Sequence, residues 1–170
     1  MSEEIFDLVD KEDQVIGQMA RSEVHRLGLM HRAVHILVFN RRGEVFLQKR
    51  SMLKDRQPGL WDSSSSGHVD SGEDYDESAL RELREELGLV PGKRPERLFK
   101  LNASSETDQE HVWVYRAESE GPFVLQAEEI SEGRWLSIEE VNRWTADRPQ
   151  DFATGFLTLW RQVAKDLTTR

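Results

Sequence analysis

Apolar residues in the first half of the chain occur in short stretches that alternate with polar ones or run together. Residues 4–9 and 13–18 alternate as strands do and flank a polar turn at 10–12, which predicts an N-terminal hairpin. Residues 21–27, followed by a glycine, predict a short helix. Residues 33–40 are almost continuously apolar, which is typical of a central strand covered on both faces.

A second hairpin follows, with a turn at 41–43 and its return strand at 44–49. After the loop at 58–59, the run Ser63–Ser66 is interpreted as a tight segment that passes the candidate site rather than as a linker. We therefore expect the N-terminal part of the molecule to be built mainly from strands.

The next stretch has helical periodicity. Asp74 and Glu77 stand at capping-box spacing and Gly88 is a suitable C-terminal cap, so a helix is predicted over 75–87. Four apolar residues fall on one arc of it, and these are Ala79, Leu80, Leu83 and Leu87. That arc can pack on a sheet, and the opposite face is expected to stay open to solvent.

Beyond this helix, strands are predicted at 96–103, 110–117, about 122–126 and 133–136. Ser137 with Glu140 forms another capping box and predicts a helix to about residue 145. Apolar residues spaced three and four apart from 152 to 167 predict an amphipathic terminal helix. This order of elements indicates an α+β fold with helices on both faces of a mixed sheet.

Composition narrows the function. The 170 residues fit one domain, 1–170, in which 1–28 form an N-terminal hairpin and short helix. Cysteine is absent, which excludes disulfides, thiolate metal sites and a cysteine nucleophile. A net charge of -9 argues against nucleic-acid binding, and the lack of a long apolar run or leader leads us to expect a cytoplasmic protein without membrane contact.

Glu82, Glu85 and Glu86 fall within an arc of roughly 100° on the predicted helix. Like charges at this spacing repel by a few tenths of a kcal/mol each. Mg²⁺ or Mn²⁺ would remove that penalty, because both prefer carboxylate oxygens and are completed by water and substrate phosphates. A solvated acidic helix face is the alternative. A basic patch precedes the helix in sequence, and its members are Arg41, Arg42, Lys49, Arg50, Lys54 and Arg56.

The wider pattern is more restrictive. Gly67, five residues, Glu73, seven residues and then Arg81-Glu82-Leu83-x-Glu85-Glu86-x-Gly88-Leu89 match every specified position of the Nudix box, over 67–89. The chain thus resembles the Nudix hydrolase superfamily (MutT-like). That resemblance implies an α/β/α sandwich and Mg²⁺-dependent cleavage of a diphosphate linkage in a nucleoside diphosphate linked to a group X.

The resemblance also implies residue roles. Glu82, Glu85, Glu86 and the carbonyl of Gly67 would hold the metal, with Glu82 also serving as, or orienting, the base for the attacking water. Glu73 and Arg81 would form the pair that orients the helix against its loop. A base from outside the box is common in the superfamily, and the candidates are Glu110, which we favour, and Glu128, Glu129 and Glu132.

A narrower resemblance, over roughly 3–136, is to the type I isopentenyl-diphosphate isomerase branch and its hydrolase-like bacterial relatives. Its motifs are Met30-His31-Arg32-Ala33, Phe39-Asn40, Gln48-Lys49-Arg50, Lys54, Pro58-Gly59-Leu60-Trp61 and Gly67-His68. The isomerase metal ligands match His31, His68, Asp108 and Glu110, with His25 one residue off in spacing, so these are candidates for a second metal or for substrate binding. Arg50 and Lys54 match the diphosphate-binding positions.

Two departures decide the predicted chemistry. The isomerase needs a cysteine where this chain has Ser66, and it lacks the glutamate that this chain retains as Glu82. The sequence therefore predicts hydrolysis, with isomerisation or a non-catalytic phosphate sensor as alternatives. His35 and His111 lie on predicted strands and are interpreted as structural. The group X stays open, and so does the oligomeric state, for which many relatives suggest a homodimer.

Overall fold

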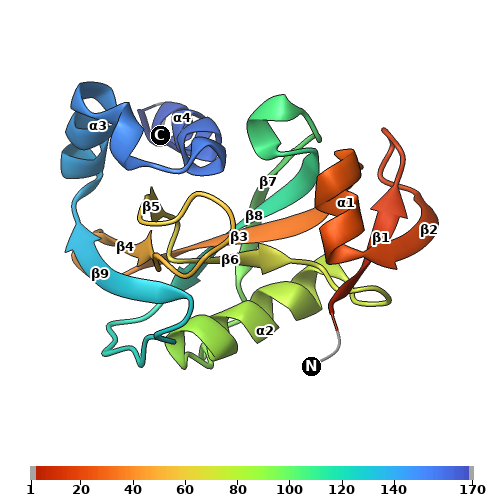
Figure 1. Ribbon diagram of the computed structural model, residues 1–170. Helices are drawn as coiled ribbons and strands as arrows, with labels where there is room; N and C mark the ends of the chain where they lie inside the picture. Colours follow the sequence, from red (N-terminus) through yellow and green to blue (C-terminus); the bar gives the residue numbers. More distant parts are fainter. Residues whose placement is uncertain (1–2, 169–170) are drawn as a thin grey trace.

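The computed structural model describes residues 3–168 of the chain (Figure 1). The strands and the two 3₁₀ turns η1 and η2 alternate with four α-helices among these residues. Their bounds in chain order are β1 Ile5–Val9, β2 Val15–Ala20, α1 Arg21–Leu27, β3 His31–Phe39, β4 Val45–Arg50, β5 Trp61–Asp62, β6 Ser65–His68, α2 Tyr75–Leu87, β7 Glu96–Leu101, η1 Ser105–Thr107, β8 Glu110–Glu118, β9 Ile130–Leu136, α3 Ile138–Asp147, η2 Pro149–Asp151 and α4 Thr154–Thr168.

Strand β3 is the centre of a mixed seven-stranded sheet ordered β5-β4-β3-β8-β7, in which β6 also pairs with β3 and β9 with β4. The long strand β8 runs parallel to β3 along its whole length, from the pair His31 and Glu110 to the pair Phe39 and Glu118. Strands β6 and β4 must therefore share the other edge of β3, where β6 pairs with residues 33–36 and β4 with residues 38–39. The sheet divides between β4 and β6.

The two faces of β3 carry different cores because successive side chains of a strand point to opposite faces. Val34, Ile36 and Val38 pack with the apolar side of α2 in one cluster. Leu37 and Phe39 pack with α3 and α4 in the other. Figure 1 shows α2 beneath the sheet and α3 and α4 above it. The predicted α+β fold, an α/β/α sandwich with a mixed central sheet, is confirmed.

Local signals placed the elements well. Helix α2 spans the predicted residues, has the predicted capping box at Asp74 and ends at Gly88, whose φ of 63° is left-handed. The predicted strand at 122–126 is wrong. Its backbone N–H groups at Val124 and Gln126 donate instead to the carbonyls of Leu87 and Glu86, at 3.0 Å each. This segment therefore caps the end of α2 rather than extending the sheet, and β9 begins only at residue 130.

The N-terminal hairpin holds the loop that leads into α2. Phe6 forms an isolated bridge with Asp70, and Ser71 N–H donates to the carbonyl of Ile5 at 2.9 Å. The Asp7 carboxylate accepts from Ser71 Oγ at 2.8 Å and from the next residue's N–H at 3.3 Å. The loop before α2 is thus fixed by a segment some 65 residues away in sequence.

A buried carboxylate ties the same hairpin to the sheet and to α2. Asp13 is only 8% exposed and accepts from Arg32 Nε at 2.7 Å, Lys100 Nζ at 2.6 Å and Tyr75 Oη at 2.7 Å. Burial alone would raise the pKa of Asp13, but these donors outweigh it and hold the pKa below its ordinary value. Among residues 3–168, none of the helices combines the length and apolar character needed to cross a lipid bilayer.

Candidate active site

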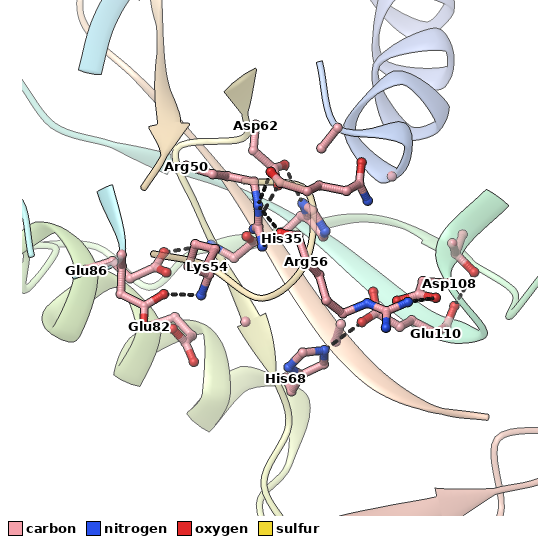
Figure 2. A pocket seen from close by; sticks show the side chains of 18 of the residues that line it. His35, Arg50, Lys54, Arg56, Asp62, His68, Glu82, Glu86, Asp108 and Glu110 are labelled. Atoms are coloured by element: carbon pink, nitrogen blue, oxygen red, sulfur yellow. Dashed lines mark hydrogen bonds and ion pairs between the residues drawn. The ribbon is translucent and has the colours of Figure 1, made fainter. Parts of the chain in front are cut away.

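A cleft of about 350 Å³ opens where β4 and β6 separate (Figure 2). Its floor comes from β3 and β6, one wall from α2, and the opposite wall from the segment between η1 and β8. The loop between β4 and β5 and the start of α4 complete the rim. The Nudix-box helix and the basic loop, which are separate in sequence, therefore face one space.

The acidic residues of α2 do not share one environment. Glu82 and Glu86 are buried, at 8% and 5% exposure, whereas the side chain of Glu85 is 54% exposed. The expectation that the acidic face stays open to solvent is therefore wrong for two of its three members. The cause is β6, which lies over this side of the helix and leaves only the outer carboxylate in solvent.

The Glu86 carboxylate is held by one oxygen. Oε1 accepts from Ser65 Oγ at 2.8 Å, Ser66 N–H at 2.9 Å and Gln48 Nε2 at 3.2 Å, while Oε2 has no hydrogen-bond donor among the described residues. Burial raises the pKa of the Glu86 carboxyl to about 7, against the opposing effect of the Ser66 and Ser65 hydrogen bonds. The serine run thus fixes the carboxylate and leaves its second oxygen available.

Glu82 lies against the backbone of Gly67. A Cβ atom built on this glycine would stand 2.2 Å from both Cδ and Oε1 of Glu82, a separation that real structures do not tolerate. Burial, and then the charge of Glu86, raise the pKa of Glu82 well above its ordinary value. The box glycine therefore lets the Glu82 carboxylate approach the backbone closely, and any larger residue would force that carboxylate to move.

The predicted Glu73 and Arg81 pair forms a two-point contact. Arg81 Nε donates to Glu73 Oε2 at 2.8 Å and Nη2 donates to Oε1 at 2.9 Å. Arg81 also donates to the carbonyl of His68 at 2.9 Å and to Glu82 Oε1 at 2.7 Å. The guanidinium thus joins the loop, β6 and one candidate metal ligand, and its planar fork suits this geometry better than lysine would.

These residues fit a divalent cation. The donors are hard oxygens, namely two buried carboxylates, an exposed third at Glu85 and the carbonyl of Gly67, which is the set that Mg²⁺ and Mn²⁺ prefer. The space beside Gly67 would be filled by any larger residue. The raised pKa of Glu82 and of Glu86 is the expected state of such ligands when no cation neutralises them.

Replacing Gly67 by alanine should lower kcat/KM by about 10- to 100-fold, because the Glu82 carboxylate must move aside and displacements of about 1 Å carry costs of this size. Steady-state kinetics at saturating Mg²⁺ measure the effect. Gly92→Ala is the matched control, since a Cβ there meets nothing within 4 Å. Equal activity in both variants would show that Glu82 has freedom to adapt.

Three cations of the basic patch line the cleft, two on the basic loop 51–60 and one at the end of β4 directly before it. Lys54 pairs with Glu129, and Arg56 Nη2 lies 2.6 Å from Asp108 Oδ1 (Figure 2). Arg50 behaves differently, since its N–H groups donate to the backbone carbonyl of Arg56 at 2.7 and 3.2 Å. Arg50, a predicted diphosphate ligand, therefore organises the loop, and Arg56 joins Lys54 as a cation facing the cleft. In the sequence, Arg56 was indicated as a binding residue only by its membership of the basic patch.

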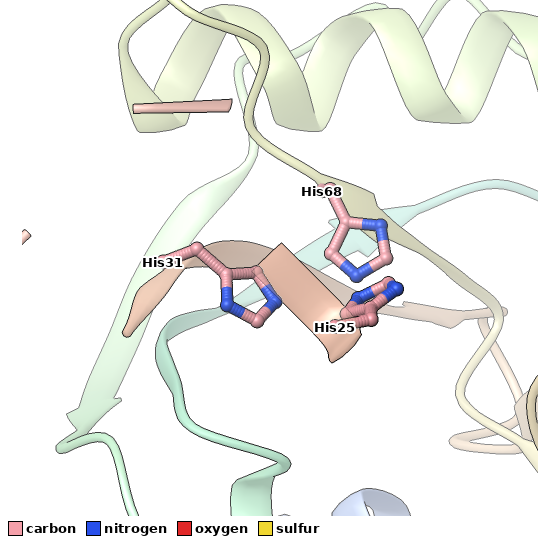
Figure 3. Close-up of side chains that lie close together, drawn as sticks. All are labelled: His25, His31 and His68. Carbon is pink, nitrogen blue, oxygen red and sulfur yellow. The ribbon is translucent and has the colours of Figure 1, made fainter. Parts of the chain in front are cut away.

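Three histidines meet beside this cleft, as Figure 3 shows. The ligand atoms of His25, His31 and His68 all lie within 4.8 Å of one another. The Nε2 atoms of His25 and His31 are buried without a hydrogen-bond partner. His25 joins the cluster despite its shifted spacing, because Gly28 ends α1 in a left-handed turn and returns the chain to β3. Asp108 stays outside it, paired with Arg56.

Glu110 completes the histidine cluster. Its Oε2 lies 2.8 Å from His68 Nε2 and 3.3 Å from His31 Nε2, although the second contact lacks hydrogen-bond alignment. Burial alone would raise the pKa of Glu110, but the two imidazoles outweigh it and hold the pKa well below its ordinary value. Burial lowers the pKa of His25 to about 4. The Glu110 carboxylate is thus engaged by two imidazoles, and its role as a base stays a prediction.

The other candidate bases differ in position. Glu129 lines the cleft but is paired with Lys54, Glu128 is exposed, and Glu132 pairs with Arg134 at 3.1 Å. Among these three, Glu129 therefore shares the cleft with the Nudix-box carboxylates, and its charge contributes to the raised pKa of Glu86.

Known proteins resemble this chain in sequence and in fold. Residues 29–154 match the NUDIX domain model. The chain is 39% identical over 140 residues to "Uncharacterized Nudix hydrolase PA4841" of Pseudomonas aeruginosa, covering 80% of each chain. It is 31% identical over 159 residues to "Isopentenyl-diphosphate Delta-isomerase 2" of Photorhabdus laumondii, covering 91% of this chain and 89% of that one. The crystal structure of DR0079 from Deinococcus radiodurans superimposes with a TM-score of 0.81 at 31% identity, covering 94% and 98%.

The fold and the site together define an enzyme class that hydrolyses diphosphate anhydrides in small molecules. The chain belongs to the NUDIX domain family and is a Nudix hydrolase.

Proposed function

We propose that this protein is a Mg²⁺-dependent hydrolase that cleaves the diphosphate linkage of a nucleoside diphosphate joined to a group X. The observation that carries the proposal is the pair of buried carboxylates, Glu82 and Glu86, which face a cleft rimmed by Lys54 and Arg56. Two buried carboxylates this close together are costly unless cations neutralise them, and Arg81 forms an ion pair with Glu82 but with no oxygen of Glu86 among the described residues. A cleft with cations on one side and oxygen ligands on the other suits a diphosphate bridged to a metal.

Glu82, Glu85, Glu86 and the Gly67 carbonyl would hold the cation. When bound, Mg²⁺ lowers the pKa of a coordinated water and stabilises negative charge on the leaving phosphate. Glu82 accepts the proton of the attacking water or orients that water. Lys54 and Arg56 exchange their carboxylate partners, Glu129 and Asp108, for phosphate oxygens. Arg81 holds Glu82 in place through its contacts with Glu73 and His68.

Ser66 supports hydrolysis over isomerisation. Its side chain stands where the isomerase branch needs a cysteine, and its N–H donates to Glu86 Oε1 at 2.9 Å. A serine hydroxyl is far less acidic than a thiol and does not replace it as a proton donor to a carbon. Incubation with isopentenyl diphosphate in D₂O should therefore give no deuterium incorporation. Incorporation at a rate above background would support the isomerase alternative.

The substrate screen tests the proposal directly. The purified protein with Mg²⁺ is incubated with nucleotide sugars, dinucleoside polyphosphates, NADH, ADP-ribose, coenzyme A and prenyl diphosphates, and both products are identified by mass. We expect hydrolysis of at least one diphosphate and its loss with EDTA. No turnover across the panel at any metal concentration would contradict it. A nucleotide complex stable for hours with Mg²⁺ would indicate a sensor.

The histidine cluster supports a second, separate cation site. His25, His31 and His68 offer imidazole nitrogens, and Glu110 offers one carboxylate oxygen, a donor set that suits Zn²⁺ or Mn²⁺ better than Mg²⁺ alone. The buried Nε2 atoms of His25 and His31, which have no hydrogen-bond partner, are the observation that favours it. Asp108, the fifth candidate, would stay with Arg56.

His25→Gln should weaken Zn²⁺ or Mn²⁺ binding by about 10- to 100-fold, because it removes one ligand from a site that holds few. Isothermal titration calorimetry and elemental analysis of the purified protein measure this without reference to turnover. Glu86→Gln is the matched control, since it alters the Nudix-box site and should leave this affinity unchanged. Equal metal content in wild type and His25→Gln would exclude the site.

A further inference from the structure

His35 is a buried histidine that the Nudix box and the histidine cluster do not use. It lies on β3, on the same face as Ala33 and Leu37, and is 8% exposed. Its side chain lines the cleft together with residues of α2 and the basic loop (Figure 2). A structural role, the interpretation from sequence, requires that both ring nitrogens have partners inside the protein.

His111 meets that requirement and His35 does not. His111 Nδ1 accepts from Ala103 N–H at 3.2 Å, and its Nε2 lies 2.9 Å from the carbonyl of Asp10. His35 has a partner only at Nδ1, which lies 2.6 Å from Ser63 Oγ. Among the described residues, His35 Nε2 has no partner, and it is not one of the buried unpartnered atoms. It is therefore open to the cleft.

The surroundings of Nδ1 determine which nitrogen carries the proton. Asp62 Oδ1 lies 3.3 Å from Ser63 Oγ and 3.6 Å from His35 Nδ1. The Asp62 carboxylate can only accept hydrogen bonds, so the assignment that satisfies both contacts of the Ser63 hydroxyl has it donate to Asp62 and accept from His35 Nδ1–H. Arg50 Nη1, 3.5 Å from Asp62 Oδ2, holds the far side of that carboxylate. In the neutral ring, Nε2 is consequently an acceptor directed to the cleft.

The cleft wall near this acceptor is polar. Within residues 3–168, alanine, at positions 33 and 153, is the only apolar residue type that lines it, and the remaining lining residues are charged, polar or glycine. A prenyl chain would meet no large apolar side chain among these lining residues, whereas a sugar could form hydrogen bonds around the cleft.

The acceptor also lies near the reacting end of the site. His35 on β3 pairs with Ser66 on β6, and Ser66 directly precedes Gly67. The N–H of Ser66 donates to Glu86 Oε1. His35 and Gly67 line the same cleft, so a group bound at His35 Nε2 shares that space with a diphosphate held beside Gly67.

We propose that His35 is a specificity residue whose Nε2 accepts a hydrogen bond from a hydroxyl of the sugar attached to the diphosphate. The substrate class is then a nucleoside diphosphate joined to a sugar, and prenyl diphosphates are poor ligands. This inference rests on the proposed function, because it places the diphosphate at the Nudix-box carboxylates. A site built to pair with a hydroxyl discriminates strongly against ligands that lack it.

Two amide variants distinguish the roles of the two ring nitrogens of His35. His35→Gln places an amide near Nε2 and can still offer an acceptor, whereas His35→Asn places it near Nδ1 and leaves the cleft position empty. The probes are ADP-ribose and UDP-glucose as substrates, and inorganic pyrophosphate as an inhibitor that has no hydroxyl on carbon. Thermal unfolding of both variants checks that the fold is retained.

In His35→Asn, kcat/KM for at least one of the two sugars should fall about 10- to 100-fold, while the Ki of pyrophosphate changes less than about threefold. His35→Gln should stay within about threefold of wild type on the same substrate. A parallel change in Ki, an equal loss in both variants, or no loss in His35→Asn would overturn the inference.

Binding measurements distinguish failure of the His35 inference from failure of the proposed function. Calorimetry with Mg²⁺ compares ADP-ribose, UDP-glucose and isopentenyl diphosphate on wild type, whether or not any is hydrolysed. Tighter binding of either sugar compound supports the role of His35, and isopentenyl diphosphate binding at least as tightly as both overturns it. Absence of turnover on the wider substrate panel bears on the hydrolase proposal alone.

Discussion

Glu86→Gln should lower kcat by about 10²- to 10³-fold with little change in fold. Glutamine is isosteric with glutamate, so its Oε1 still accepts from Ser65 and Ser66. The variant loses only the negative charge of the oxygen that faces the cleft, and charge stabilisation of this kind is worth orders of magnitude in a water-poor site. Steady-state kinetics on the substrate identified by the screen, with a Mg²⁺ titration, measure the loss.

The matched control for this variant is Glu96→Gln, which changes an exposed glutamate at the start of β7. It should retain wild-type kcat. If Glu86→Gln also kept wild-type kcat at every Mg²⁺ concentration, Glu86 would not be a cation ligand, and the proposal built on the two buried carboxylates would have to be abandoned.

The second large effect is on stability in the absence of metal. Burial raises the pKa of Glu86 from its ordinary 4.5 to about 7, so the folded protein binds this proton more tightly than the unfolded chain does. Its contribution is fully present below pH 4.5 and is lost as the pH rises toward 7. The loss is about 3 kcal/mol. Metal-free wild type should therefore lose that much stability over this range relative to Glu86→Gln.

Urea unfolding in EDTA at several pH values measures this difference, and the comparison with Glu86→Gln cancels the contributions of groups that do not interact with Glu86. The charge of Glu86 is one of the causes that raise the pKa of Glu82, so the substitution also removes part of the Glu82 contribution and adds to the difference between the two proteins. Mg²⁺ at pH 7.5 should restore stability to wild type and much less to the variant, because only the folded state holds the site. Parallel pH profiles for the two proteins would show that Glu86 is not a destabilising charge.

Much of the fold follows from local signals in the sequence. The capping box at Asp74 and the glycine at 88 predicted both ends of α2 to the exact residue. This was possible because the groups that satisfy the helix ends are neighbours of the helix in sequence. The same holds for α1, which spans the predicted 21–27 and stops at Gly28. The segment 122–126 has strand-like composition, yet its hydrogen bonds go to the end of α2, and no local pattern encodes that partner.

The candidate site, too, was predictable from the sequence only where its residues lie close together in the chain. The spacing of Gly67, Glu73, Arg81 and the three box glutamates identified the family, because the loop and helix that carry them are contiguous. The partners of Asp108 and Arg50 were not predictable, since each lies on a loop whose path depends on distant contacts. The open Nε2 of His35 depends likewise on Ser63, 28 residues away, and on the separation of β4 and β6.

By itself the sequence determined the periodicities, the helix boundaries, the Nudix box and the hydrolase class, because these rest on interactions between residues close in the chain. Only the tertiary structure decided that two of the three box glutamates are buried, that His25 joins His31 and His68, and that Asp108 does not. The physical reason is that burial and ligand proximity are set by strand register and helix packing. Those are long-range properties, which the order of residues constrains but does not display.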